Sequence, residues 1–358
     1  MRSRASRAVV LCAGALVPSL PATAVAEPLV IGHRGASGHR PEHTLAAYAL
    51  AARMGADYVE ADLVSTKDGV LVARHENNIA DTTDVASRPE FADRRTTKTI
   101  DDAVQVGWFT EDFTLAELRT LRAKERLPAV RQRNTVYDGR YAIPTLQEVV
   151  DLTRRLSREL HRRIGIYPET KHPTYFQSIG LPLEPPLVET LERNRLNRRG
   201  AKVFVQSFET ANLKALGAQL RVPLVQLLDM PTRRPYDVVV AGGTTTYADM
   251  ATPEGLAEIA AYADTVGPSK DYIVARDPDA SIAGPTSFVA DGHAAGLQVH
   301  PYTFRNENQF LPLDFRRGDD PNAYGNAFAE YALFFGLGVD GVFSDNPDTA
   351  VAAREEAG

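Results

Sequence analysis

The sequence predicts an α/β fold, a (β/α)8 barrel, because short apolar runs typical of strands alternate with helical patterns from residue 28 to the end. Polar and charged side chains follow many of these runs directly, and the carboxyl ends of barrel strands are where sites are built. A doubly wound sheet is the alternative, but no Gly-x-Gly-x-x-Gly follows the first predicted strand. We expect one domain over residues 27–358, with residues 77–140 inserted over the face that carries the polar strand ends.

The first half of the chain supplies the clearest elements. Strands are predicted at 29–33, 58–64 and 70–75, and apolar residues at helical spacing indicate a helix from Leu45 to Ala52. Thr66-Lys-Asp-Gly69 is a turn signal that joins the second and third strands as a hairpin. After the irregular segment 77–140, the alternation resumes with a helix over 145–160 and a strand over 164–169.

The second half continues the same alternation. A helix is expected from about Thr210. Further helices are expected near 253–263, 285–295 and 325–336, and strands at 203–208, 224–228, 272–275, 297–304 and 341–344.

Residues 1–26 differ from the rest of the chain. Three arginines, an uncharged apolar stretch over 8–20 and the small-residue pattern Ala24-Val25-Ala26 predict a secretory signal peptide. The apolar stretch is shorter than the length that a membrane-spanning helix usually needs. We therefore expect export, to a periplasm or beyond the cell. The only cysteine, Cys12, lies in this segment, so the mature chain has no disulfide and no cysteine-type zinc site.

The net charge of the full chain is −6, and the signal segment contains no acidic residue, so the mature chain is more acidic still. An acidic balance argues against a nucleic-acid partner, whose binding needs a basic face. It does not exclude an anionic small molecule, because a metal or an arginine can reverse the local field.

Two acidic residues, Glu60 and Asp62, lie on the second predicted strand. Side chains alternate along a strand, so both carboxylates face the same side, roughly 7 Å apart. Two inward carboxylates repel unless a cation lies between them, and their hard oxygens suit Ca²⁺ or Mg²⁺. The alternative is the solvent face of an edge strand. The turn at 66–69 favours a site, because a hairpin returns His75 beside the two acids as a general acid or base.

Two further strand ends carry candidates for the same site. Glu169 ends the strand at 164–169 and is a candidate third ligand, with Lys171 on the same face if the chain stays extended. The alternative for this pair is an exposed ion pair of little consequence. His33 and Arg34 lie between two glycines after the first strand, where Arg34 could grip a phosphate through paired donors.

Taken together, the motifs resemble the glycerophosphodiester phosphodiesterases, and the periplasmic branch in particular. The resemblance spans about residues 28–350. It rests on residues 32–38 (Gly-His-Arg-Gly-Ala-Ser-Gly), 41–44 (Pro-Glu-His-Thr), 55–64 (Gly-Ala-Asp-Tyr-Val-Glu-Ala-Asp-Leu-Val), 66–69 (Thr-Lys-Asp-Gly), 71–75 (Leu-Val-Ala-Arg-His), 167–171 (Tyr-Pro-Glu-Thr-Lys), 299–303 (Val-His-Pro-Tyr-Thr) and 340–345 (Asp-Gly-Val-Phe-Ser-Asp).

The resemblance implies a barrel shared with phosphatidylinositol-type phospholipases C. It implies metal-dependent hydrolysis of glycerophosphodiesters to an alcohol and sn-glycerol 3-phosphate. The implied roles are an acid/base pair, ligands of a divalent cation that is usually calcium, and phosphate-binding cations: His33 and His75; Glu60, Asp62 and Glu169; Arg34 and Lys171. From their places at strand ends, we expect contacts with the substrate from Gln206, Phe208 and Tyr302.

Two departures from the family pattern bear on the site. Glu76 follows the second histidine, where the family usually has aspartate, and Ser344-Asp-Asn-Pro replaces the usual Thr-Asp-Phe-Pro. Two other functions stay open: a phospholipase D acting on sphingomyelin or lysophospholipids, and a non-catalytic binding protein for glycerophosphodiesters. The remaining histidines have weaker claims, and His161 and His293 are expected at the surface.

Overall fold

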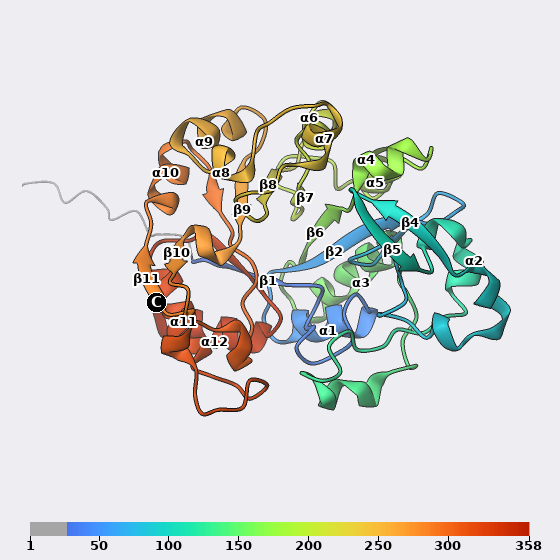
Figure 1. Cartoon of the computed structure of the whole chain (residues 1–358), viewed down its shortest axis with the longest axis horizontal. Coiled ribbons are helices and arrows are strands. Elements are labelled where there is room, and N and C mark those ends of the chain that lie inside the picture. Colours follow the sequence, from blue (N-terminus) through green and yellow to red (C-terminus); the bar gives the residue numbers. More distant parts are fainter. Residues whose placement is uncertain (1–26, 358) are drawn as a thin grey trace, which may run out of the picture.

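The computed structural model describes residues 27–357, and its centre is a sheet of eight parallel strands (Figure 1). The order around the sheet is β12-β9-β8-β7-β6-β2-β1-β13. The bounds are β1 (Leu29–Gly32), β2 (Tyr58–Ser65), β6 (Gly165–Thr170), β7 (Val205–Ser207), β8 (Leu224–Leu228), β9 (Thr265–Pro268), β12 (Gln298–Val299) and β13 (Gly341–Ser344).

Hydrogen bonds between the two ends of this sheet nearly close it into a barrel. The chain beyond β12 runs beside β13, where the Phe343 amide donates to the Pro301 carbonyl and the Phe304 amide donates to the Phe343 carbonyl. Closure removes the free edges that an open sheet exposes. The predicted (β/α)8 barrel is therefore confirmed.

Helices surround the barrel and cover the outer faces of its strands (Figure 1). The longest, α3, begins at a capping box in which the Thr145 hydroxyl accepts from the Glu148 amide while the Glu148 carboxylate accepts from the Thr145 amide. The helices outside segment 77–140 are α1 (Leu45–Arg53), α3 (Leu146–Glu159), α4 (Pro173–Ser178), α5 (Glu184–Arg193), α6 (Thr210–Gly217), α7 (Tyr236–Val240), α8 (Tyr247–Met250), α9 (Pro253–Ala260), α10 (Phe288–Ala294), α11 (Ala327–Gly336) and α12 (Pro347–Ala357). Three short 3₁₀ turns accompany them, η5 (Lys270–Tyr272), η6 (Asn308–Phe310) and η7 (Leu313–Phe315).

A layer of apolar side chains fills the barrel below its polar end. Its members are Ile31, Tyr58, Tyr167, Phe204, Val225, Leu227 and Phe343. Tyr167 stacks on Phe204 with ring centroids 4.9 Å apart. Gly165 makes room for this layer, because an added Cβ would lie 2.2 Å from the Tyr58 ring. Side chains two positions further along these strands point into the barrel one layer higher, which is where the polar strand ends gather.

The hairpin predicted after the second strand is present. β3 (Leu71–Ala73) pairs antiparallel with β2, with Leu63 opposite Ala73. The Arg74 amide then donates to the Asp62 carbonyl, which extends the pairing by one residue toward His75. The turn signal therefore places His75 beside the end of β2, as expected.

The strand predicted at 272–275 is wrong as a barrel strand. That place in the sheet belongs to β9, and the chain at 274–276 is β10 (Val274–Arg276), which pairs only with β11 (Ile282–Pro285) in a separate ribbon. The sequence of β9 ends in Gly267-Pro268, which is typical of a turn. The Leu227 side chain occupies the space beside this glycine, because an added Cβ would lie 2.6 Å from its end.

Segment 77–140 contains a second ribbon and several short helical turns. The ribbon pairs β4 (Thr96–Ile100) with β5 (Ala103–Gly107), and it extends from the barrel beside β6 and α4 (Figure 1). The other elements are η1 (Val85–Ser87), η2 (Pro89–Arg94), η3 (Thr110–Asp112), α2 (Leu115–Leu118) and η4 (Gln132–Tyr137).

The expected signal peptide, residues 1–26, lies outside the described residues. Among residues 27–357, no helix is both long enough and apolar enough to cross a membrane.

Candidate active site

Three acidic residues converge at the carboxyl ends of neighbouring strands. Glu60 and Asp62 come from β2 and Glu169 from β6, where Asp62 and Glu169 are direct partners in the register. One carboxylate oxygen of each lies within 4.8 Å of the others, and all three side chains are buried. Each of Glu60 and Glu169 follows a barrel-filling tyrosine by two positions, so the alternation of the strands explains why they point inward.

The electrostatics of this acid cluster fit a bound cation. Burial is the main reason that the pKa of Glu60 lies well above its ordinary value, and the Asp62 and Glu169 carboxylates raise it further. Burial also raises the pKa of Glu169 to about 7, against the effect of Lys171. Asp62 Oδ1 is buried without a hydrogen-bond partner within residues 27–357. Three hard oxygen donors with an unused lone pair match the ligands that Ca²⁺ and Mg²⁺ prefer.

Two neutral groups hold the acid cluster in place. Gln206, from β7, donates its side-chain amide to Glu60 Oε1 at 2.8 Å. His43 donates from Nε2 to Asp62 Oδ2 at 2.9 Å, and its Nδ1 accepts from the Tyr48 hydroxyl at 2.7 Å. His43 is fully buried, so its ring fixes the rotamer of Asp62 from behind.

His33 follows β1 and faces the acid cluster. Its Nε2 lies 3.8 Å from Glu60 Oε2, and its Nδ1 is hydrogen bonded to the Asp345 carboxylate at the end of β13. Asp345 in turn pairs with Arg131 at 2.6 Å and Arg305 at 2.8 Å. Burial lowers the pKa of His33 to about 4, although Asp345 acts to raise it. A neutral ring that bonds a carboxylate through Nδ1 presents an unprotonated Nε2 to the cavity.

Arg34 lies in a left-handed backbone conformation with φ 58°, directly before Gly35 with φ 87°. This turn lets the Arg34 amide donate to Glu60 Oε2 at 2.9 Å. Its guanidinium pairs with Glu42 at 3.1 Å and lies 3.5 Å from Asp62 Oδ2. An added Cβ on Gly35 would lie 2.7 Å from the Ala47 backbone, so the sharp turn requires glycine there.

His75 lies beside Lys171 on the other side of the acid cluster. The two nitrogens, His75 Nε2 and Lys171 Nζ, are 3.5 Å apart, and Lys171 Nζ also lies 3.1 Å from Glu169 Oε1. His75 Nδ1 pairs with Glu76 Oε1 at 2.8 Å. Burial, together with the charges of Arg34 and Lys171, lowers the pKa of His75 to about 3. Glutamate at position 76 therefore reaches the imidazole despite its extra methylene.

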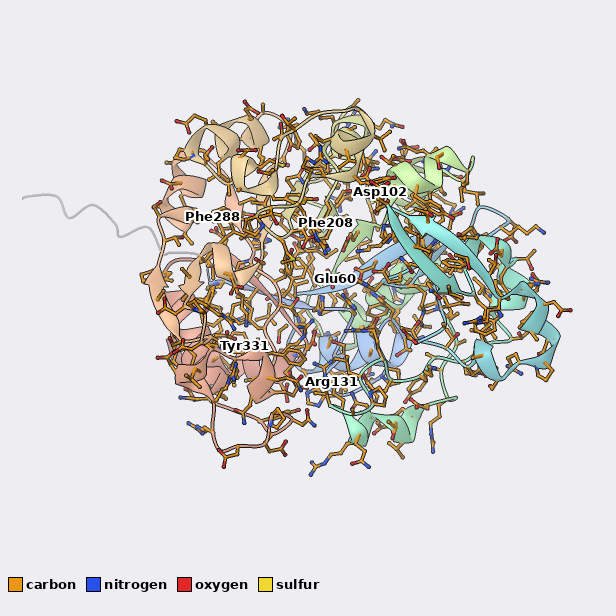
Figure 2. All side chains as sticks on the ribbon, viewed as in Figure 1. Glu60, Asp102, Arg131, Phe208, Phe288 and Tyr331 are labelled. Carbon is orange, nitrogen blue, oxygen red and sulfur yellow. The ribbon has the colours of Figure 1, made fainter. Side chains whose placement is uncertain are left out.

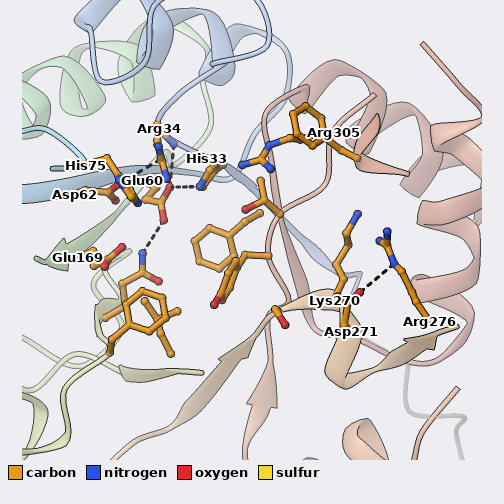
Figure 3. Close-up of a pocket in the computed structure, with 18 residues that line it drawn as sticks. His33, Arg34, Glu60, Asp62, His75, Glu169, Lys270, Asp271, Arg276 and Arg305 are labelled. Carbon is orange, nitrogen blue, oxygen red and sulfur yellow. Dashed lines mark hydrogen bonds and ion pairs between the residues drawn. The ribbon is translucent and has the colours of Figure 1, made fainter. Parts of the chain in front are cut away.

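The acid cluster, Arg34 and the two imidazoles share one cavity of about 340 Å³ (Figure 3). Its acidic end carries the two imidazoles, and its other wall carries Lys270, Asp271 and Arg276 (Figure 3). The predicted site residues that line it are His33, Arg34, Glu60, Asp62, His75, Glu169, Gln206, Phe208 and Tyr302. Lys171 lines a neighbouring cavity of about 760 Å³ that shares His75, Glu169, Phe208 and Tyr302 with the first.

The aromatic pair Phe208 and Tyr302 lies where the two cavities meet. Their rings are edge to face, with centroids 6.1 Å apart, and the Tyr302 hydroxyl donates to the Leu228 carbonyl at 2.7 Å. Lys171 Nζ lies 5.5 Å from the Phe208 ring centroid. Every site residue predicted from the sequence is therefore brought to one end of the barrel, around Glu60 and Phe208 (Figure 2).

Comparison with known proteins identifies the family. The sequence pattern of the Glycerophosphoryl diester phosphodiesterase family matches residues 33–349. The chain belongs to this family. The glycerophosphodiester phosphodiesterase GDPD6 of Arabidopsis thaliana is 38% identical over 331 residues, covering 89% of this chain and 83% of that protein. The glycerophosphodiester phosphodiesterase of Haemophilus influenzae is 30% identical, covering 91% and 89%. The expected enzyme class is thereby confirmed.

Solved structures show the same fold in proteins of distant sequence. A glycerophosphodiester phosphodiesterase from Agrobacterium tumefaciens matches with a TM-score of 0.52 at 20% identity, covering 91% of this chain and 99% of that chain. An Oleispira antarctica phosphodiesterase in complex with the product sn-glycerol-3-phosphate matches with a TM-score of 0.55 at 20% identity, covering 92% and 97%.

Several residues of this candidate site were not predicted from the sequence. Asp345, His43 and His172 each hydrogen bond a predicted site residue or its partner. Asp345 and His43 lie inside two of the motifs on which the family resemblance rests. These motifs could have marked both as site residues, although a motif does not show which side chain each residue contacts. His161 and His293 are exposed, as expected.

Proposed function

We propose that the enzyme hydrolyses glycerophosphodiesters to an alcohol and sn-glycerol 3-phosphate, with His33 and His75 as the acid/base pair beside a divalent cation. One observation carries the proposal: the buried cluster of three carboxylates lies in the same cavity as two imidazoles. The carboxylates supply a cation site, and the imidazoles supply the two proton transfers that phosphodiester cleavage needs.

The cation site would be formed by Glu60, Asp62 and Glu169. All three donors are oxygens, and no cysteine or histidine nitrogen is among them. Such a set suits Ca²⁺ or Mg²⁺. Ca²⁺ is the ion proposed, in line with the resemblance that the sequence carries. When bound, the cation would neutralise charge on a non-bridging phosphate oxygen.

The chain's own residues then perform the following tasks. Arg34 and Lys171 hold phosphate oxygens, because both are cations at the margin of the acid cluster. The two imidazoles start the reaction in opposite protonation states. The one without a proton on Nε2 takes the proton of the attacking hydroxyl, and the other, protonated on both ring nitrogens, gives its Nε2 proton to the leaving alcohol oxygen. Asp345 and Glu76 hold the Nδ1 proton of each ring, so each Nε2 is left for the reaction.

The substrate's non-reacting groups have polar and aromatic surfaces to contact. Gln206, Phe208 and Tyr302 line the cavity beyond the acid cluster. The Oleispira antarctica phosphodiesterase is described in complex with the product sn-glycerol-3-phosphate, which supports a glycerol phosphate as the part that this site retains.

The test of the acid/base assignment is glycerol 3-phosphate release from glycerophosphocholine by His33→Ala and His75→Ala. Each variant should lose roughly 10²–10⁴-fold in kcat, the range of one general acid or base. His293→Ala is the matched control, because His293 is exposed and pairs with Asp340 away from the cavity. Wild-type rates in folded His33→Ala and His75→Ala would remove the assignment.

The same assay separates the two alternatives left open by the sequence. Lysophosphatidylcholine and sphingomyelin are offered beside glycerophosphocholine. Preference for the lipids would favour a phospholipase D. Binding of glycerophosphocholine without release of choline would favour a non-catalytic binding protein.

We propose further that residues 27–358 act as one phosphodiesterase domain, with 77–140 as an insertion, and that the chain is exported after removal of residues 1–26. The N-terminal sequence of the protein recovered from outside the cytoplasm tests the second point. A mature chain that begins at or near Glu27 supports it, and a retained Met1 contradicts it.

A further inference from the structure

A chain of four side chains connects the tip of the β4–β5 ribbon to His75. His75 Nδ1 pairs with Glu76 Oε1 at 2.8 Å, and Glu76 Oε2 lies 3.0 Å from His172 Nε2. His172 Nδ1 lies 2.5 Å from Asp101 Oδ2. Each of the two inner members, Glu76 and His172, is therefore bound on both sides.

The ribbon tip is a two-residue turn that carries two aspartates. Ile100 pairs with Ala103, so Asp101 and Asp102 form a two-residue turn, with φ 47° and 64°. Turns with positive φ at both positions favour glycine, asparagine and aspartate. Both carboxylates reach across to the barrel: Asp101 to His172, and Asp102 to the Tyr236 hydroxyl at 3.2 Å. Figure 2 shows Asp102 at the end of the ribbon that faces the strand ends.

His172 is also held in a strained conformation. Its φ of 49° and ψ of 46° are left-handed, and Pro173 follows it as the first residue of α4. Non-glycine residues occupy this region only where their surroundings enforce it. With a carboxylate at each ring nitrogen, both nitrogens are donors and the ring is a cation. Burial acts to lower the pKa of His172, but the bonds to Asp101 and Glu76 outweigh it and raise the pKa to about 9.

Glu76 needs such a partner to orient His75. Its side chain is 37% exposed, and a glutamate has three rotatable bonds to fix. The contact with His172 removes that freedom, because it takes the oxygen that His75 does not use. A fixed Glu76 keeps the proton of His75 on Nδ1 and turns Nε2 toward Lys171 and the cavity.

We propose that Asp101 and His172 are positioning residues of the phosphodiesterase, which act on His75 through Glu76. The inference rests on the proposed role of His75. It gives the β4–β5 ribbon a task in the reaction, namely that its tip sets the orientation of one of the two imidazoles.

The first test compares two glycine substitutions in the same turn. Asp101→Gly and Asp102→Gly both keep the positive φ and each removes one carboxylate. Asp101→Gly should lower kcat for glycerophosphocholine by roughly 10- to 100-fold, the usual effect of losing an outer partner, with KM changed by less than about twofold. Asp102→Gly should stay near the wild-type kcat. Equal rates in the two variants would overturn the proposal.

The second test asks whether the effect passes through Glu76. In a Glu76→Gln background, Asp101→Gly should cause little further loss, because residues that act in one chain are not additive. A loss of the same size in both backgrounds would mean that Asp101 acts by another route, and would also overturn the proposal. If Asp101→Gly does not fold, His172→Asn can replace it in the wild-type and Glu76→Gln backgrounds, because asparagine tolerates a left-handed backbone.

The His75→Ala variant separates this inference from the function on which it rests. If His75→Ala is as active as the wild type, the acid/base assignment itself fails. If His75→Ala is slow while Asp101→Gly and His172→Asn are not, only the positioning role fails.

Discussion

The Asp345 carboxylate is hydrogen bonded to Nδ1 of His33, across 312 positions of sequence. The contact joins the ends of β13 and β1, which are neighbours in the barrel. Burial acts to raise the pKa of Asp345, but Arg131, Arg305 and His33 outweigh burial and hold it well below its ordinary value. Asp345 is therefore an acceptor only, and neutral His33 carries its proton on Nδ1.

Replacement of Asp345 by asparagine should impair the reaction in the molecules that remain folded. An asparagine can donate to Nδ1 and so favour the wrong tautomer of His33, as loss of the orienting acid does in other histidine sites. We expect kcat for glycerophosphocholine to fall by roughly 10²–10⁴-fold with little change in KM. Steady-state kinetics checks this, and circular dichroism confirms the fold. An unchanged kcat would show that the contact does not set the state of His33.

Arg131 should matter for stability. Its side chain is 4% exposed, and it pairs with Glu307 at 2.8 Å and Asp345 at 2.6 Å. Arg131→Ala would leave two buried carboxylates without that cation. We expect the free energy of unfolding to fall by about 3–5 kcal/mol, the usual cost of breaking a buried ion pair. Urea denaturation measures the loss. The exposed pair of Arg193 and Glu189 is the control, and Arg193→Ala should cost less than about 1 kcal/mol.

Calcium should stabilise the folded chain through the acid cluster. A ligand that binds only the folded state at 100 times its Kd adds about 2.7 kcal/mol to the free energy of unfolding. We expect a gain of this kind in the wild type, and a much smaller one in Glu60→Gln and Glu169→Gln. Thermal unfolding with and without Ca²⁺ after chelation gives the comparison. An equal gain in the wild type and both variants would place the bound ion elsewhere.

The charge on His172 makes a pH-dependent contribution to stability. Its pKa rises from 6.5 to about 9 on folding, so the folded state binds the proton more tightly. The resulting stabilisation is complete below pH 6.5 and is lost as the pH rises through about 9. The difference in unfolding free energy between the wild type and His172→Asn should therefore shrink over that range. Urea denaturation of both proteins below pH 6.5 and above about pH 9 tests this expectation. A difference in unfolding free energy that does not vary with pH would contradict it.

Local patterns predicted most of the barrel and the whole acid cluster. The turn at 66–69 placed His75, and the alternation along β2 placed Glu60 and Asp62 on one face. These features can be predicted from the sequence because each depends on residues only a few positions apart in the chain. β9 was missed for the opposite reason, since the space beside its Gly267 is filled by Leu227 of the adjacent strand, which is distant in sequence.

The partners of the catalytic candidates could not be predicted in this way. Asp345 and His33 are 312 positions apart, and His172 and Glu76 are 96 apart. Their pairing depends on the closure of the barrel and on the reach of the β4–β5 ribbon. The sequence marks neither with a periodic pattern, so only the three-dimensional arrangement reveals them.

The proposal that the acid cluster holds the catalytic cation is tested most directly by the rate of glycerol 3-phosphate release from glycerophosphocholine as Ca²⁺ is returned to fully chelated enzyme. We expect a rate near zero without the ion, and a rise that saturates with one Ca²⁺ per chain and is lost in Glu169→Gln. An undiminished rate in the chelated enzyme would contradict it.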